Sequence, residues 1–86
     1  MSHPASMIEP VTPNRLLAFE RDNPAHTPAK SERIRHHLGI SEVRYYALLA
    51  RAARSAEGIA AYPVTARIVR ERAERRARAR HERTAV

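Results

Sequence analysis

Large apolar side chains are few in this 86-residue chain, and apart from the C-terminal Val86 they end at Val69. Of 37 hydrophobic residues 16 are alanine, and five of the 21 larger ones lie in the first eleven residues or at the C-terminus. A core of about fifteen large side chains supports one small domain that buries about 60% of its surface on folding. We therefore expect the residues beyond Arg70 to project into solvent or lie on a partner.

The charge is concentrated in two blocks. Sixteen basic residues, fifteen of them arginine, stand against nine acidic ones, which leaves a net charge of +7. Residues 30–54 carry +4 of this charge and residues 67–86 carry +5, while the rest of the chain is slightly acidic. Because the arginine guanidinium matches phosphate geometry, this pattern points first to nucleic acid and then to acidic membrane or protein surfaces.

Several functional classes are disfavoured by composition. The chain has no cysteine, which excludes disulfides, thiolate nucleophiles and cysteine-based zinc sites. No convincing nucleophile–base pair or glycine-rich phosphate loop is visible, and the adjacent His36 and His37 diverge on a helix. No apolar run approaches the roughly 18–20 residues of a membrane span, and no signal peptide is evident. We expect a cytoplasmic protein, located on the nucleoid, that is not an enzyme and uses no metal, cofactor or membrane.

Capping residues and apolar spacing predict an all-α fold. No segment shows the two-residue alternation of a half-buried strand. The expected helices cover residues 13–22, 29–38, 42–54, a short turn around Ile59, and 63–82. Residues 1–11 lack periodicity and are expected to be disordered.

The second and third helices fit a helix-turn-helix. Gly39, Ile40 and Ser41 form the three-residue turn that joins them. Apolar residues on both sides of this turn, Ile34 and Tyr45 among them, can converge on one core. We expect a small domain over residues 12–69 with a sigma-factor-like or resolvase-like helix-turn-helix, followed by an extended arginine-rich C-terminal helix over 70–86.

The outward face of the 42–54 helix is the predicted reading surface for duplex DNA. First-turn positions of such helices meet base edges in the major groove. The residues expected to contact bases or the groove are Ser41, Glu42, Arg44, Tyr46 and Ala47. Those expected to contact phosphates are Lys30, Arg33, Arg35, Arg51, Arg67, Arg70, Arg72, Arg75, Arg76, Arg78 and Arg80. The alternative is an ordinary helical hairpin with a solvated basic face.

The C-terminal segment allows three interpretations. It is a helix or arm that grips phosphates, a solvated tail that aids solubility, or a weak pairing seam through Ala66, Val69 and Ala73. The charge of +5 in twenty residues favours contact with DNA.

Several short motifs occur in an order that resembles a known family. They are Leu16-Leu17-Ala18-Phe19-Glu20-Arg21, Ala29-Lys30, Ile34-Arg35, Leu38-Gly39-Ile40-Ser41 and Arg44-Tyr45-Tyr46. The chain is similar over about residues 14–80 to a family of small basic actinobacterial proteins described only as a domain of unknown function. A mycobacterial member is described as a nucleoid-associated DNA-binding protein. The resemblance implies DNA binding with an architectural or regulatory role.

The leading expectation is a transcription regulator or nucleoid-associated architectural protein whose partner is double-stranded DNA. Two further partners fit this role: a second copy of the chain aligned by DNA, and RNA polymerase. A different class remains open, namely an adaptor that docks on an acidic surface of the transcription machinery. RNA binding comes third, because no aromatic stacking platform is evident.

Overall fold

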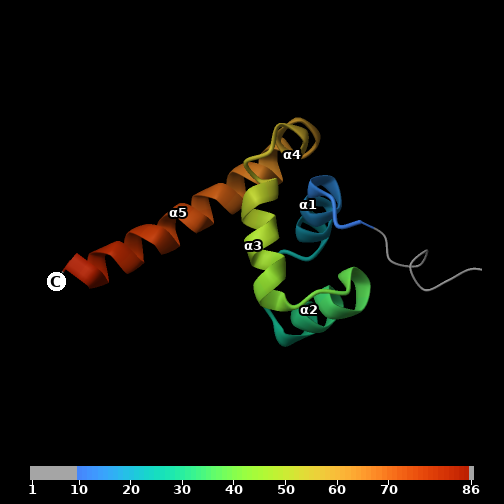
Figure 1. The fold of residues 1–86 in the computed structure, drawn as a ribbon, viewed down its shortest axis with the longest axis horizontal. Helices are drawn as coiled ribbons and strands as arrows, with labels where there is room; N and C mark the ends of the chain where they lie inside the picture. Colours follow the sequence, from blue (N-terminus) through green and yellow to red (C-terminus); the bar gives the residue numbers. More distant parts are fainter. Residues whose placement is uncertain (1–9, 86) are drawn as a thin grey trace, which may run out of the picture.

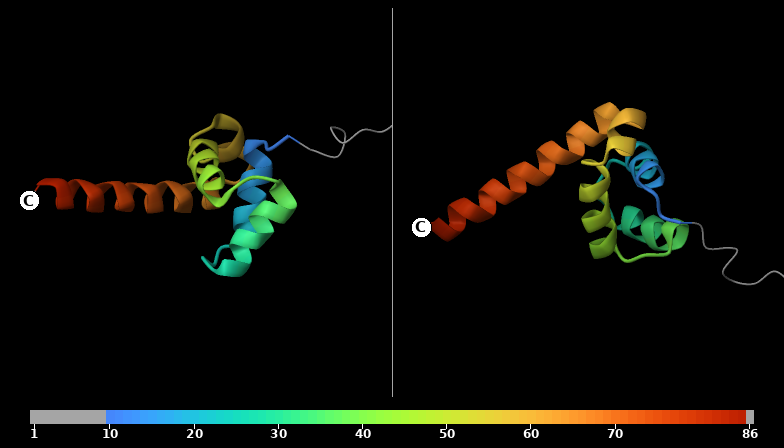
Figure 2. Two further views of the ribbon diagram at one scale, coloured as in Figure 1. Left: turned by 60° about the horizontal axis from the view of Figure 1, so that its bottom comes forward. Right: turned by 45° about the horizontal axis from the view of Figure 1, so that its top comes forward.

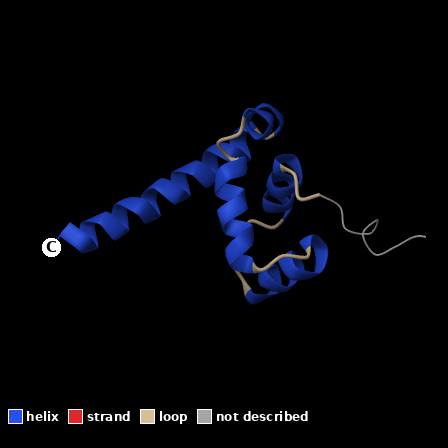
Figure 3. Cartoon of the chain, in the orientation of Figure 1, coloured by secondary structure: helices blue, strands red, loops and turns tan. Residues whose placement is uncertain are grey.

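A computed structural model describes residues 10–85, and in this part of the chain every regular element is a helix, which confirms the predicted all-α class (Figure 3). In chain order the elements are α1 (Pro13–Asp22), α2 (Pro28–Arg33), η2 (Ile34–Leu38), α3 (Glu42–Ala52), α4 (Ala56–Ala61) and α5 (Pro63–Ala85). The segment predicted to be disordered, 1–11, lies outside the described residues except for Pro10 and Val11, which are not helical.

Hydroxyl side chains set the start of four helices. Thr12, Thr27, Ser41 and Ser55 each accept a hydrogen bond from the backbone N–H three residues later, at 2.9 to 3.2 Å. Each bond satisfies an N–H that has no partner inside the helix. The α1 range of 13–22 agrees with the prediction from sequence, and the other helices differ from it by one to three residues at their ends.

The core lies where α1, α3 and the first part of α5 meet. Leu17, Tyr45 and Leu49 are almost fully buried, and α5 adds Ala66 and Val69 to the same cluster. Beyond Ala73 α5 leaves the body and continues as a rod (Figures 1 and 2), so that the molecule measures 59 Å along its longest axis. Because the large apolar residues of the described chain end at Val69, only the first half of α5 packs against the body and its second half projects into solvent.

The helix before the turn is not α-helical throughout. Its second half, η2, is a wider π-helical turn, where the sequence predicted a continuous α-helix over 29–38. Ile34 and Leu38 are buried in this turn while the three residues between them are exposed. Gly39 ends the helix with a left-handed φ of +72°, and its N–H donates to the Arg35 carbonyl at 3.0 Å. This is the conformation that glycine adopts at lowest cost.

A second glycine permits close packing between α4 and the body. A Cβ on Gly58 would lie 2.6 Å from Leu17 Cδ1 and would also overlap the backbone oxygen of Ala52. Ser55 closes the corner, because its hydroxyl donates to the Ala52 carbonyl at 2.8 Å and accepts from Gly58 N–H at 2.9 Å. The end of α3 is thus held against α4, which directs α5 back across α3.

Candidate nucleic-acid interface

The outward face of α3, together with the turn just past its end, carries three arginines in one stripe. Tyr45, Leu49 and Ala52 face the core, which leaves the opposite side of the helix in solvent. The exposed residues at spacings of three and four are Arg44, Ala47, Arg51 and Arg54. A stripe of this kind, with a small residue between cations, can approach a polyanionic surface closely along most of the helix.

The structure brings only some of the predicted reading residues onto this stripe. Arg44 and Ala47 lie on it, whereas Tyr46 is half-buried at its edge. Ser41 is exposed, but its hydroxyl accepts from the Arg44 N–H and serves as the helix cap. Glu42 is half-buried.

Two exposed residues of this surface were not among the predicted contacts. Arg54 completes the stripe just past the end of α3. Val43 is 82% exposed on the first turn of α3, the highest exposure of any large apolar side chain in the described residues. The positions 44, 47, 51 and 54 repeat at helical spacing, so this periodicity could have identified Arg54 from the sequence.

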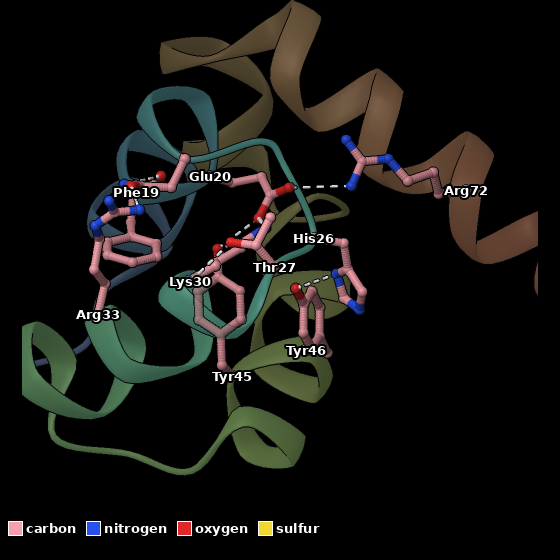
Figure 4. Close-up of polar contacts among 10 residues, drawn as sticks. Phe19, Glu20, His26, Thr27, Lys30, Arg33, Tyr45, Tyr46 and Arg72 are labelled. Carbon is pink, nitrogen blue, oxygen red and sulfur yellow. Dashed lines mark hydrogen bonds and ion pairs between the residues drawn. The ribbon is translucent and has the colours of Figure 1, made fainter.

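The prediction that Lys30 contacts phosphate is wrong. The side chain of Lys30 is 2% exposed, and its Nζ donates to Glu20 Oε1 at 2.8 Å. The same oxygen accepts from the hydroxyl of Tyr45 at 2.7 Å (Figure 4). Lys30 is therefore buried and cannot reach a phosphate. A buried cation requires a paired anion, and the carboxylate of Glu20, ten residues earlier, supplies it.

Arg72 completes the network around Glu20. Its Nη1 donates to Glu20 Oε2 at 3.1 Å, so that one buried carboxylate joins α1, α2, α3 and α5 (Figure 4). Arg70 makes a second link, since its Nη1 donates to the carbonyl of Ala53 at the C-terminal end of α3 at 2.8 Å. A cation at this position also interacts favourably with the helix dipole. Both arginines were predicted to grip phosphate, and the structure uses both to hold α5 to the body.

Burial and the carboxylate of Glu20 together raise the pKa of Tyr45 far above its ordinary value of 10.0. Burial is the larger cause, because it disfavours the charged phenolate, and the hydrogen bond to Glu20 adds to it. Tyr45 therefore stays protonated and donates its hydrogen bond to Glu20 at any ordinary pH. At the surface, the side-chain hydrogen bond between Arg21 and Asp22 and the charge of Asp22 raise the pKa of Arg21.

A groove of about 300 Å³ runs between α3 and α5. Its floor is apolar, formed in part by Leu49 and Val69, and its polar lining includes His26, Arg72 and Arg76. The Tyr46 hydroxyl and His26 Nδ1 share a hydrogen bond of 2.8 Å on one wall (Figure 4). Tyr46 therefore faces this groove rather than the arginine stripe.

The remaining predicted phosphate contacts are exposed. On the helix before the turn these are Arg33 and Arg35, and Arg33 also donates to Asn23 Oδ1 at 3.2 Å. On α5 they are Arg67, Arg75, Arg76, Arg78 and Arg80. Those on α5 are distributed around the helix, so a single duplex could meet only part of them.

The described residues form neither a metal-binding cluster nor a membrane-spanning helix. Residues 10–85 contain no group of three or more histidine, aspartate or glutamate side chains placed to hold a metal ion. None of the helices described is long and apolar enough to cross a membrane.

Comparison with known proteins places the chain in a family of unknown function. The curated proteins and the solved structures gave no match. The family DUF3263, described as a protein of unknown function, matches residues 11–81, which span the helices from α1 to most of α5. The chain therefore belongs to the DUF3263 family.

Proposed function

We propose that this protein binds duplex DNA, with α3 in the major groove and the exposed arginines of α5 on the phosphates. In this proposal α2 and η2 form the first helix of a helix-turn-helix and α3 is its recognition helix. The protein would act at the nucleoid as a transcription regulator or as an architectural protein.

The arginine stripe on α3 is the observation that carries the proposal. Arg44, Arg51 and Arg54 point away from the core along the whole helix, and no described element packs over them. Their helix follows a three-residue turn at Gly39, the connection typical of a helix-turn-helix. The major groove of B-DNA is wide enough to admit an α-helix, so this cationic helix face can lie within it.

Individual roles follow from position on the stripe. Arg44, on the first turn of α3, is placed to bond guanine bidentately, and the small Ala47 beside it lets the helix come close to the bases. Arg51 and Arg54, farther along, are placed to reach phosphates on one strand. Lys30, Arg70 and Arg72 have no role in the proposal, because the fold already uses them.

The projecting half of α5 supports binding without reading sequence. Arg76 and Arg80 share one side of the rod, while Arg75 and Arg78 lie on the other. Contacts of this kind add affinity through counterion release but do not discriminate between bases. Each duplex would use one side of the rod, the phosphate-facing part of the α3 stripe and exposed arginines of the helix before the turn, which together correspond to roughly five to eight phosphates.

A competition experiment tests the proposal. Gel shifts compare duplex DNA, single-stranded DNA and structured RNA, with heparin as competitor. We expect the complex with duplex DNA to resist competition by heparin best. The logarithm of the affinity for duplex DNA should fall against the logarithm of salt concentration with a slope of about −4.5 to −7. A slope shallower than about −2 would contradict it, and loss of all nucleic-acid binding would favour the adaptor that docks on an acidic protein surface.

Matched variants separate contacts to bases from contacts to phosphates. Replacing Arg75, Arg76 and Arg78 with alanine removes one or two phosphate contacts, depending on which side of the rod meets the duplex. Binding to all sequences should weaken alike, and the salt slope should decrease by about 0.9 to 1.8. Arg44→Ala should change which sequences a random duplex library yields. Arg21→Ala is the control, since it removes one cation from α1, where Arg21 already pairs with Asp22. An unchanged library with Arg44→Ala would remove Arg44 from the reading role.

A further inference from the structure

Exposed apolar side chains gather on α4 and the start of α5. Among the described residues, four large apolar side chains are exposed, and three of them are Ile59 at 40%, Val64 at 58% and Ile68 at 40%. Single exposed apolar residues are common, but a group on adjacent elements marks an interaction surface more often. The fourth, Val43, lies apart on α3.

The first turns of α5 are apolar on two opposite sides. Ala66 and Val69 face inward and are at most 5% exposed. Val64 and Ile68, four residues apart, share the outward side. A helix that is hydrophobic all round is usually buried on all sides, so the outward side lacks a cover in the isolated chain. The inward side, which the sequence suggested as a pairing seam, is already part of the core and is not available for pairing.

This apolar surface lies in an electrically neutral segment. Residues 55–71 contain two arginines and two glutamates, whereas the whole chain carries +7. Arg70 is directed inward to the Ala53 carbonyl, which leaves Glu57, Arg67 and Glu71 as the exposed charges of the segment. A polyanion would not select this surface, and two copies can approach each other here without bringing their arginine-rich parts together.

We propose that the outward side of α5 around Ile68 binds a second copy of the chain in an antiparallel, two-fold symmetric pair. Arg67 and Glu71 flank Ile68, one before it and one after it. A two-fold axis at the level of Val69 places Arg67 of each copy opposite Glu71 of the other, with the two Ile68 side chains packed between the ion pairs. An isologous interface requires this kind of self-complementarity, in which residue i meets residue j in both directions.

The pair does not depend on DNA binding, and its test needs no nucleic acid. Sedimentation equilibrium of the full chain, from about 10 μM to 1 mM at physiological salt, measures the dissociation constant of the dimer directly. Ile68→Glu should raise it about tenfold or more, because a carboxylate would be buried between apolar surfaces. Circular dichroism of each variant verifies that the fold is intact.

Charge reversal tests the orientation. Arg67→Glu and Glu71→Arg should each weaken the dimer, because each places like charges opposite one another, and the double variant should restore it. Arg78→Glu is the matched control, since Arg78 and Glu82 repeat the same arginine–glutamate spacing farther along α5 and should have no effect. The proposal is overturned if the chain stays monomeric throughout, if the double variant fails to rescue, or if Arg78→Glu weakens the dimer equally.

Discussion

The two halves of α5 are both rich in arginine but differ in what their arginines do. In the first half Arg70 and Arg72 donate to a helix-end carbonyl and to a buried carboxylate. In the second half every side chain from Glu74 to Thr84 is exposed. Arginine side chains therefore stabilise this fold where a buried acceptor lies within hydrogen-bond distance. Where no such acceptor is near, they stay exposed and are available to a partner.

The difference originates in α1 rather than in α5. Glu20 is 2% exposed and takes Lys30, Tyr45 and Arg72 as donors. A buried carboxylate needs such partners, because removing an unpaired charge from water costs several kcal/mol. The first half of α5 supplies one of these partners, Arg72, whereas the side chains of the second half are exposed.

Removing the charge at the centre of this network should destabilise the protein more than any other single change. Glu20→Gln would leave Lys30 buried without an anion, and we expect a loss of about 3–5 kcal/mol in the free energy of unfolding. Urea denaturation followed by circular dichroism measures it. Glu74→Gln on the projecting half is the control and should change stability by no more than about 0.5 kcal/mol. Equal losses in both variants would mean that the halves of α5 do not differ.

A pair of arginine variants compares the two halves directly. Arg72→Ala removes a charge-assisted hydrogen bond to a buried acceptor and should lower stability by about 1.5–3 kcal/mol. Arg75→Ala, three residues later, should leave the melting temperature unchanged and lower DNA affinity instead. If Arg75→Ala destabilises the protein as strongly as Arg72→Ala, the projecting half must have a structural partner.

Glycine substitutions test the same contrast without altering charge. Ala66→Gly removes a fully buried methyl group and reduces helix propensity, so the global stability should fall by about 1–2 kcal/mol. Ala77→Gly makes the same change on the exposed rod. It should reduce the helical circular dichroism signal while the unfolding midpoint of the body stays in place, and a shift of that midpoint would contradict the prediction.

The effect that the titration of Tyr45 has on stability is expected to be smaller and to occur in alkaline solution. Because folding raises the pKa of Tyr45, the folded state retains a proton that the unfolded chain loses above about pH 10. The contribution of Tyr45 to stability should therefore be constant below that pH and fall by up to about 1.4 kcal/mol per pH unit above it. Tyr45→Phe should flatten this decline in urea titrations at successive pH values; an unaltered slope would assign the decline to other groups.

Helix positions could be predicted because their signals are local. Thr12 followed by Pro13, and Ser41 ahead of Glu42, mark helix starts through bonds that span three residues. The π-helical turn η2 was not predicted, since Ile34 and Leu38 have the same spacing in an α-helix and the wider turn becomes visible only in the folded chain.

The candidate interface was predicted in part. Arg44, Ala47 and Arg51 lie on the exposed stripe as the helical spacing requires, and Arg54 follows the same rule. The role of Lys30 was misjudged because its partner is Glu20, and that of Arg72 because it reaches the same residue across 52 positions. No periodicity connects residues so far apart, so their exposure could not be inferred from spacing.

The amino-acid sequence alone predicts that this protein is helical, where its helices begin, and that α5 extends beyond the core. These features depend on caps, helical periodicity and the position of the last large apolar residue, which are all properties of neighbouring positions. Which cations are available to a partner depends on how the chain folds. That choice depends on which of them come within hydrogen-bond distance of a buried acceptor, either the Glu20 carboxylate or the Ala53 carbonyl, and chain folding alone brings them there.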